Sequence, residues 1–252
     1  MIVGDVIYGV ESRSRFVLKP LDDSLLVTCG YNPADVLSCS IVGSSGEISA
    51  EDLPHLPLVD YELILTRFYI CSFGDAINQN MECKNCLKKF SITFSLASWV
   101  SDVCNSIPAE SPHVFDNTRF SLPTQALLST IEPKVNTLAE KLWCSDTALP
   151  AERLGEFESY VASVCPILTD HIESDCPHCG EFCSKEFVLK THLLNKLKSQ
   201  LNVLLTDIHL LATKYHWSLR DILDLPRQTR KTLAGMIRHQ TQPSSAAPGR
   251  TL

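Results

Sequence analysis

The sequence predicts an α+β protein: a small β element, a mainly helical remainder, and a long C-terminal helix followed by two short helices. The β element is indicated by two short Cys-x-x-Cys segments, each beside strand-like residues. The long helix is indicated by apolar residues at alternating spacings of three and four after residue 186. Hydrophobic residues make up 44% of the 252 positions and charged residues 20%, which is typical of a soluble globular protein.

The first 60 residues are expected to form an N-terminal region of strands and loops. Apolar runs of strand length lie at 7–10, 14–21 and 23–30, and they are separated by Gly, Asp-Asp and Asn-Pro breaks. The next segment, 60–75, has apolar residues at helical spacing, with Gly74 as a C-terminal stop. We therefore predict a helix there.

Residues 61–185 are expected to form the central region, with a helical insertion. Phe90, Ile92, Phe94 and Leu96 alternate with small polar residues, which predicts a strand with one buried face. Proline and serine in 105–125 predict a loop, and helices are expected at 124–143 and 151–170.

A third region, 186–240, begins with the long helix. It is expected to stop near 215–217, and its apolar seam comprises Leu194, Leu197, Leu201, Leu204, Ile208 and Leu211. The seam either packs on the chain's own core or forms a coiled coil or partner groove. Both interpretations fit the spacing, although three heptads is short for a free-standing coiled coil.

Two short helices follow the long one. Ser218 and Asp221 have the spacing of a capping box and predict a helix over 219–224. Pro226 suits the first turn of a helix running to about residue 239. The exposed face of this last helix is expected to carry Arg227, Arg230, Lys231 and Arg238. The tail, 241–252, lacks apolar content and is expected to be disordered.

The strongest chemical signal is the pair of C-x-x-C segments, Cys83/Cys86 and Cys176/Cys179. Each places two thiolates on one side of a tight turn, and two such knuckles supply the four sulfur ligands of a tetrahedral zinc site. The β element is therefore expected to be zinc-ribbon-like. Gly180 follows the second pair and favours a left-handed turn position.

Two alternatives stay open at the cysteines. The 89 residues between the knuckles exceed the usual spacing, and either His178 or Cys183 could serve as a ligand because both lie beside the second knuckle. Alternatively the four thiols are free, or one C-x-x-C pair is a redox site. With four sulfur ligands the site has no open position for substrate, so we expect one structural zinc ion.

The chain has eleven cysteines, and six lie singly among apolar residues, where small core residues are the expectation. They are Cys29, Cys39, Cys71, Cys104, Cys144 and Cys165. The first residues lack a basic segment followed by an apolar run, and no stretch is long enough for a membrane helix. We therefore expect a protein of the reducing cytoplasm that does not enter a membrane.

Several function classes lack support in the sequence. It contains no phosphate-binding glycine loop, no G-x-S-x-G elbow and no H-E-x-x-H helix, so we expect no enzyme and no catalytic residue. Residues 1–183 carry a net charge of −14 and residues 184–252 one of +7. This asymmetry suggests that the two parts attract each other or face different partners.

Parts of the sequence resemble a known family, the baseplate hub assembly chaperones of T-even-type contractile-tailed phages and of related contractile injection systems. The resemblance rests on LILTRFYICSFGD, CKNCLKKFSITF, FSLPT at 120–124, and DCPHCGEF. It also rests on DIHLLATKYHWSLRDILDLPRQTRKTLAGMI. The first 60 residues match poorly, and Cys183 is an extra cysteine.

This resemblance implies a non-enzymatic assembly factor, or a minor baseplate component, in the cytoplasm of a producing bacterial cell or in the assembled particle. It implies hub, spike or other baseplate proteins as partners, and zinc ligands at Cys83, Cys86, Cys176 and Cys179. The residues expected to meet a partner are the six of the seam together with Trp217, Arg227, Arg230 and Lys231. Nucleic-acid binding through the basic C-terminal helices is the alternative, and an interaction module unrelated to tails is another.

Overall fold

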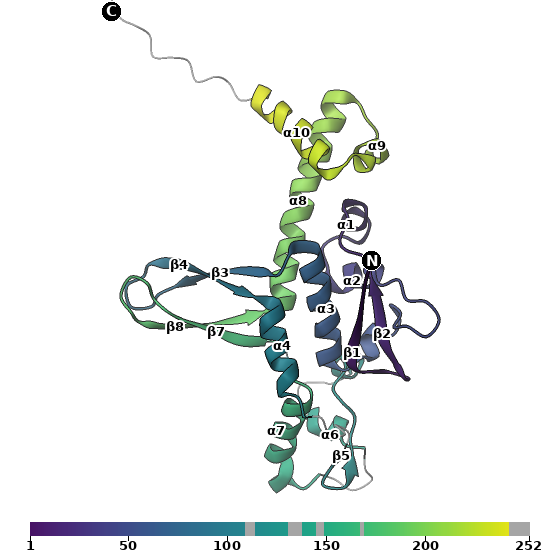
Figure 1. The fold of residues 1–252 in the computed structure, drawn as a ribbon, viewed down its shortest axis with the longest axis vertical. Helices are drawn as coiled ribbons and strands as arrows, with labels where there is room; N and C mark the ends of the chain where they lie inside the picture. Colours follow the sequence, from purple (N-terminus) through teal and green to yellow (C-terminus); the bar gives the residue numbers. More distant parts are fainter. Residues whose placement is uncertain (109–113, 131–137, 145–148, 167–168, 242–252) are drawn as a thin grey trace, which may run out of the picture.

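A single long helix, α8 (Leu189–Tyr215), forms the spine of the molecule (Figure 1). The computed structural model describes residues 1–108, 114–130, 138–144, 149–166 and 169–241. Two β-hairpins project from one side of the spine. The N-terminal elements lie on the other side, and α9 and α10 pack around its far end (Figure 1). The predicted α+β class and the C-terminal helix are confirmed.

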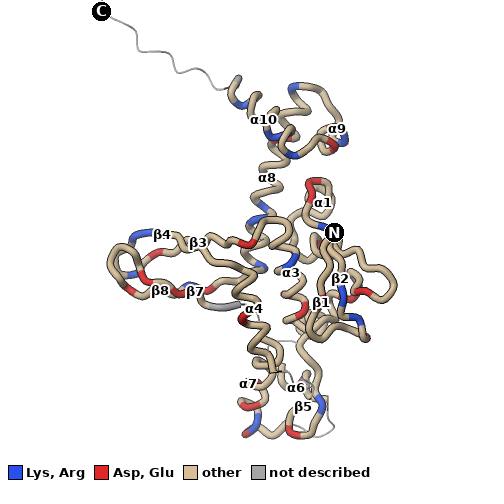
Figure 2. Tube along the Cα trace, in the orientation of Figure 1, with Lys and Arg blue, Asp and Glu red and all other residues tan. Residues whose placement is uncertain are grey.

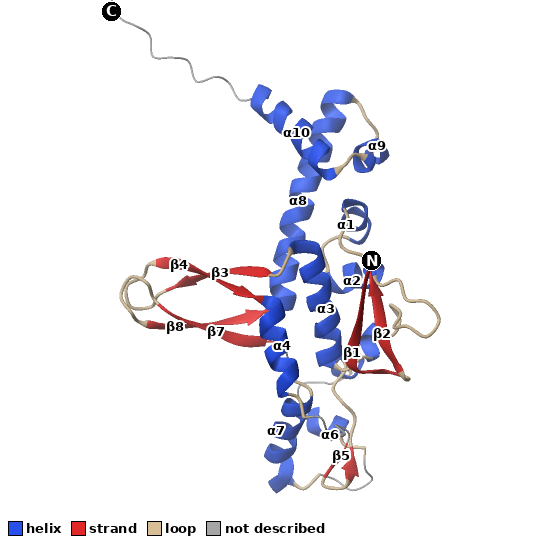
Figure 3. Ribbon diagram, viewed as in Figure 1, coloured by secondary structure: helices blue, strands red, loops and turns tan. Residues whose placement is uncertain are grey.

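The described strands pair into four separate two-stranded antiparallel sheets, and helices make up most of the remainder (Figure 3). The strands are β1 (Ile2–Val10), β2 (Arg13–Leu18), β3 (Ala76–Glu82), β4 (Lys89–Ser95), β5 (Val114–Phe115), β6 (Thr118–Arg119), β7 (Thr169–Asp175) and β8 (Phe182–Val188). The other helices are α1 (Asp23–Cys29), α2 (Pro33–Ser40), α3 (Leu58–Phe73), α4 (Leu96–Ser106), α5 (Gln125–Ser129), α6 (Leu138–Leu142), α7 (Leu154–Val164), α9 (Leu219–Asp224) and α10 (Arg227–Thr241), with 3₁₀ turns at Leu53–His55 and Ala151–Arg153.

The apolar seam of α8 faces the chain's own core. Leu197, Leu204 and Leu211 are buried, and Leu201 and Ile208 are half-buried against the main core. This core draws on α1, α2 and α3 as well as on the hairpins, so burial of the stripe fixes α8 to the N-terminal half. Packing on the chain's own core is therefore confirmed. The partner-binding interpretation is wrong for Leu197, Leu204 and Leu211, because none of them reaches the surface.

The N-terminal region contains two helices that the sequence analysis did not predict. The run 23–30 forms α1 rather than a strand, because the Asp22 side chain accepts a hydrogen bond from the Leu25 backbone N–H and caps the helix. Asn32 caps α2 in the same way, and Pro33 occupies its first turn. The strand predicted at 7–10 lies in β1, and the one predicted at 14–21 is confirmed only as far as Leu18, where β2 ends.

A buried carboxylate joins this hairpin to α3. Asp60 is fully buried, and its oxygens accept hydrogen bonds from the backbone N–H groups of Ile7, Tyr8 and Gly9 at 2.8, 3.0 and 2.8 Å. The pairing of β1 with β2 shifts register in this stretch, which leaves backbone donors free for the carboxylate. The helix predicted over 60–75 is confirmed as α3, with Gly74 as its C-cap.

Predictions for the central region were less accurate. The strand expected at 90–96 is β4, but Ser95 then caps α4, a helix that was not predicted. The segment 105–125 contains the short β5–β6 hairpin rather than loop alone. The helix expected at 124–143 is seen as α5 and α6, with 131–137 outside the described residues, and the one at 151–170 ends at Val164.

The C-terminal helices fold back on the end of α8. Ser218 and Asp221 form the predicted capping box of α9, and α10 starts after Pro226. The carboxylate of Asp207 on α8, which is 1% exposed, pairs with Arg238 on α10. Arg230 is 2% exposed and pairs with Asp23 at the start of α1. The expectation that Arg230 lies on an exposed basic face is therefore wrong. The predicted disordered tail falls on 242–252, outside the described residues.

Lysines and arginines lie along α8 and α10, and acidic side chains are spread over the hairpins and the N-terminal elements (Figure 2). Basic residues of α10 form ion pairs with the N-terminal part of the chain, where Arg227 and Arg230 contact Asp23. One consequence of the predicted asymmetry, attraction between the two parts of the chain, is thus seen at this contact. Within the described residues, no helix is both long and apolar enough to cross a membrane.

Candidate metal centre

Two hairpins, β3–β4 and β7–β8, carry the C-x-x-C segments at their tips (Figure 1). In the first tip the Cys83 N–H donates to the Lys88 carbonyl at 3.0 Å, and the Leu87 N–H donates to the Cys83 carbonyl at 2.9 Å. In the second, the Cys176 N–H donates to the Glu181 carbonyl at 2.8 Å, and the Gly180 N–H to the Cys176 carbonyl at 2.9 Å. The two knuckles therefore have the same backbone hydrogen-bond pattern.

Each knuckle has a left-handed residue four positions after its first cysteine. Gly180 has φ of 73°, which glycine adopts without cost, whereas Leu87 has φ of 59° and pays a steric penalty there. Leu87 is also 71% exposed, so burial does not compensate the strain. Both tips therefore adopt the same turn, but only the second tip has a glycine at the left-handed position.

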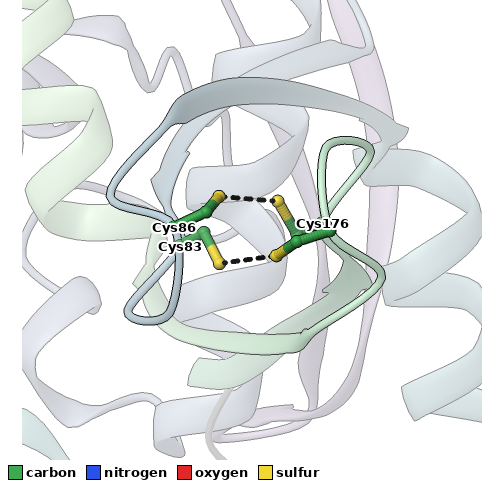
Figure 4. Close-up of side chains that lie close together, drawn as sticks. Cys83, Cys86 and Cys176 are labelled. Atoms are coloured by element: carbon green, nitrogen blue, oxygen red, sulfur yellow. Dashed lines mark hydrogen bonds between the residues drawn. The ribbon is translucent and has the colours of Figure 1, made fainter.

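The two tips face each other so that four sulfur atoms converge (Figure 4). The Sγ atoms of Cys83 and Cys179 are 3.5 Å apart, those of Cys86 and Cys176 are 3.7 Å apart, and all four lie within 4.8 Å of one another. A tetrahedral ion with four Zn–S bonds of about 2.3 Å requires sulfur atoms about 3.8 Å apart. The geometry of the cluster thus fits one tetrahedral metal ion.

The cluster is closed on one side and open on the other. Cys83 and Cys176 are buried, Cys86 is half-buried and Cys179 is exposed. Side chains of Met81, Phe90, Ile92 and Cys183 pack around the sulfurs to form a small apolar core between the hairpins. Outside this core, Lys185 Nζ donates to the Asn80 carbonyl at 2.8 Å and links the hairpins at their edge. At the tips themselves, the Asn85 side-chain amide donates to the Cys179 sulfur at 3.9 Å.

The electrostatics of the sulfurs favour a bound cation. The backbone N–H of Cys86 is the main reason that the pKa of Cys83 falls to about 6, so this sulfur is a thiolate at neutral pH. The pKa of Cys179 rises to about 12 despite a backbone hydrogen bond at Glu181, because desolvation and the sulfurs of Cys83, Cys86 and Cys176 favour its protonated form. Four thiolates this close repel each other, and a dication removes the repulsion.

The structure brings together all four cysteines predicted as ligands. His178 is exposed and lies outside the group of four, and Cys183 is buried beside it. The group of four sulfurs that could hold a metal ion is therefore made of the four predicted cysteines. No other group of three or more potential ligands was found among the described residues.

The remaining predicted site residues are scattered over the C-terminal helices. Trp217 is 38% exposed and stacks on Tyr215, with ring centroids 5.0 Å apart. Arg227 is half-exposed and hydrogen-bonds Gln200, while Lys231 is exposed and Leu194 half-buried. Sequence analysis missed Tyr215 and Leu219, which are exposed beside Trp217. The signal for them was available, since both flank the predicted end of the long helix.

Two of the six single cysteines form a pair that was not expected. Cys29 at the end of α1 and Cys39 in α2 are joined by a disulfide across 10 residues, which corrects the expectation of buried thiols at these positions. Cys144 is exposed, also against expectation, whereas Cys165 is buried and burial raises its pKa to about 11. Cys71 and Cys104 are half-buried thiols.

Comparisons with protein-family models, with curated proteins and with solved structures give no match to this chain. Function is therefore inferred from the chemistry of the sulfur cluster and from the surfaces of the described residues.

Proposed function

We propose that the four cysteines hold one structural zinc ion that clamps the two hairpins in a zinc-ribbon-like element. The observation that carries this proposal is the tetrahedral spacing of four sulfur atoms contributed equally by two facing hairpin tips. Zinc is the common metal for a four-thiolate tetrahedral site without redox chemistry. Because the protein supplies all four ligands, no position is left for water or substrate, so the ion contributes to folding and not to catalysis.

The partner surface in this proposal is the end of α8 and the turn into α9. Tyr215, Trp217 and Leu219 expose large apolar side chains within five residues, and the left-handed residue His216 turns the chain between the two aromatic rings. Exposed Trp and Tyr with a neighbouring arginine are typical of the residues that dominate binding energy in protein interfaces. Arg220, whose side chain is 91% exposed, supplies that arginine here.

From these two features we propose a non-enzymatic assembly factor or minor component of a contractile-tail or injection-system baseplate, binding hub, spike or other baseplate proteins. The resemblance of the C-terminal segment around 208–238 to hub assembly chaperones supports the proposal, since this segment carries the exposed aromatic turn. The nucleic-acid-binding alternative is less favoured. Arg230 is buried against Asp23, and Arg227 and Arg238 are paired with side chains of the same chain.

The test is affinity purification of the full chain from cells that produce the particles, followed by mass spectrometry. Hub, spike or wedge proteins should be recovered with the wild-type protein and lost with the Tyr215→Ala/Trp217→Ala variant. Val3→Ala is the matched control, because Val3 is similarly exposed but lies on β1, away from the aromatic turn. Recovery of nucleic acid or transcription proteins without tail proteins would overturn the assignment.

A further inference from the structure

A fifth cysteine lies inside the metal centre without belonging to the group of four. Cys183 is 7% exposed and packs in the same small core as Cys83, Cys86 and Cys176. It lies on β8 opposite Ser174 of β7, two residues beyond the knuckle hydrogen bond at Glu181. Its neighbours Phe182 and Ser184 are exposed, so strand alternation directs the Cys183 side chain to the inner face with the metal ligands.

The environment of this thiol is that of a ligand rather than of an ordinary core residue. Its side chain packs in the core formed with Cys83, Cys86 and Cys176 between the two hairpins. The Cys183 thiol donates a long hydrogen bond, 3.5 Å, to the Glu181 carbonyl.

Cys183 is placed to replace one ligand in particular. Cys83 Sγ lies 3.5 Å from Cys179 Sγ, and Cys83 is also buried in the same small core as Cys183. Cys179 is the exposed ligand, and therefore the one that solvent-borne reagents reach. Cys86 and Cys176 form the other close sulfur pair, at 3.7 Å, and both are less exposed than Cys179.

We propose that Cys183 is a reserve zinc ligand that takes the position of Cys179 when that sulfur is lost to oxidation or alkylation. The thiol of Cys183 releases its proton to solvent as it binds the ion, so four thiolates surround the metal before and after the exchange, and no electron is transferred. The hairpin clamp then survives damage to its exposed ligand. This inference rests on the proposed zinc site. It adds that the site keeps four sulfur ligands after the loss of Cys179.

The test uses Co²⁺ alone as the probe, added to the metal-free full chain, because the intensity of the sulfur-to-cobalt charge-transfer band reports the number of thiolate ligands. Four proteins are compared with the wild type: Cys179→Ala, Cys183→Ala, Cys179→Ala/Cys183→Ala and Cys86→Ala. The first two should give the wild-type band. The double variant and Cys86→Ala should give the weaker band of a three-thiolate site.

Affinity should follow the same order. We expect Cys179→Ala to weaken metal binding by about tenfold or less, the lower end of what a change outside the ligand shell costs. We expect the double variant and Cys86→Ala to lose well over about 100-fold, beyond that range. A three-thiolate band from Cys179→Ala itself, with or without a histidine ligand from His178, would overturn the inference. Absence of bound metal in the wild type would instead overturn the zinc site.

A second measurement covers the case in which Cys179→Ala does not fold. Both the wild type and Cys183→Ala carry Cys144→Ala in this experiment, because Cys144 is the other exposed cysteine among the described residues. The zinc-loaded proteins are treated with iodoacetamide, which then reaches the exposed Cys179 first. Zinc is counted in singly modified molecules by native mass spectrometry. The wild type should keep its zinc after modification at Cys179, whereas Cys183→Ala should release it. Equal release from both proteins would contradict the reserve role.

Discussion

Replacing Cys176 by serine should remove the metal-mediated link between the β3–β4 and β7–β8 hairpins. Cys176 is 2% exposed and supplies one of the four clustered sulfurs, so its replacement leaves three thiolates and a buried hydroxyl that binds zinc poorly. Among the described residues, the remaining links between the hairpins include the small apolar core and the hydrogen bonds from Lys185 to Asn80 and from Asn85 to Cys179.

The size of the effect follows from the length of chain that the metal closes. Cys86 and Cys176 are 90 residues apart, and a cross-link over such a loop is worth about 4–5 kcal/mol when treated as loop-closure entropy. Each kcal/mol shifts the melting temperature of a domain this large by about 2–4 °C. The expected fall in melting temperature is therefore about 10–20 °C.

Thermal unfolding followed by circular dichroism, together with zinc counted by mass spectrometry of the same samples, measures both consequences. Cys104→Ser is the matched control, because Cys104 is half-buried on α4 and lies outside the sulfur cluster. It should keep one zinc per chain and nearly the wild-type melting temperature. A Cys176→Ser protein that kept its zinc and its melting temperature would refute the four-cysteine clamp.

Three further changes test the supporting structure. Arg230→Met should lower the free energy of unfolding in urea by about 3 kcal/mol, since it removes the buried one of the two arginines that pair with Asp23. A Lys231→Met control should leave this free energy unchanged. Asp60→Asn should lower the free energy of unfolding by about 3 kcal/mol in the same assay, because a neutral amide cannot accept all three backbone hydrogen bonds. A decrease of less than half that size would contradict the role of Asp60 in joining the β1–β2 hairpin to α3. Burial and the nearby Lys196 lower the pKa of His192 below its ordinary 6.5, so the free energy of unfolding should decrease as the pH falls below that value. The His192→Phe variant should lose this pH dependence. An unchanged pH profile in the variant would exclude His192 as its cause.

The features that sequence predicted well are those with a local cause. The two knuckles follow from the chemistry of C-x-x-C, and α9 follows from the Ser218–Asp221 capping box. The length of α8 followed from the spacing of its leucines, although its start was placed three residues early because β8 continues to Val188. In each case the residues that decide the structure lie within a few positions of one another.

The errors have two physical origins. Short helices such as α1 were mistaken for strands because Leu25, Leu26 and Val27 form an apolar run without visible period, and the deciding signal was the cap at Asp22. Burial of Arg230 depends on Asp23, 207 residues earlier in the chain, so no local pattern could reveal it. The same holds for the position of Cys183 beside Cys83, which only the facing of two distant hairpins creates.

The central claim is tested most directly by zinc X-ray absorption spectroscopy on the purified wild-type chain, with metal content measured on the same sample. One zinc per chain with four sulfur neighbours at about 2.3 Å is the predicted result. A protein without metal, or a zinc ion with nitrogen or oxygen in place of a sulfur neighbour, would contradict the four-cysteine site.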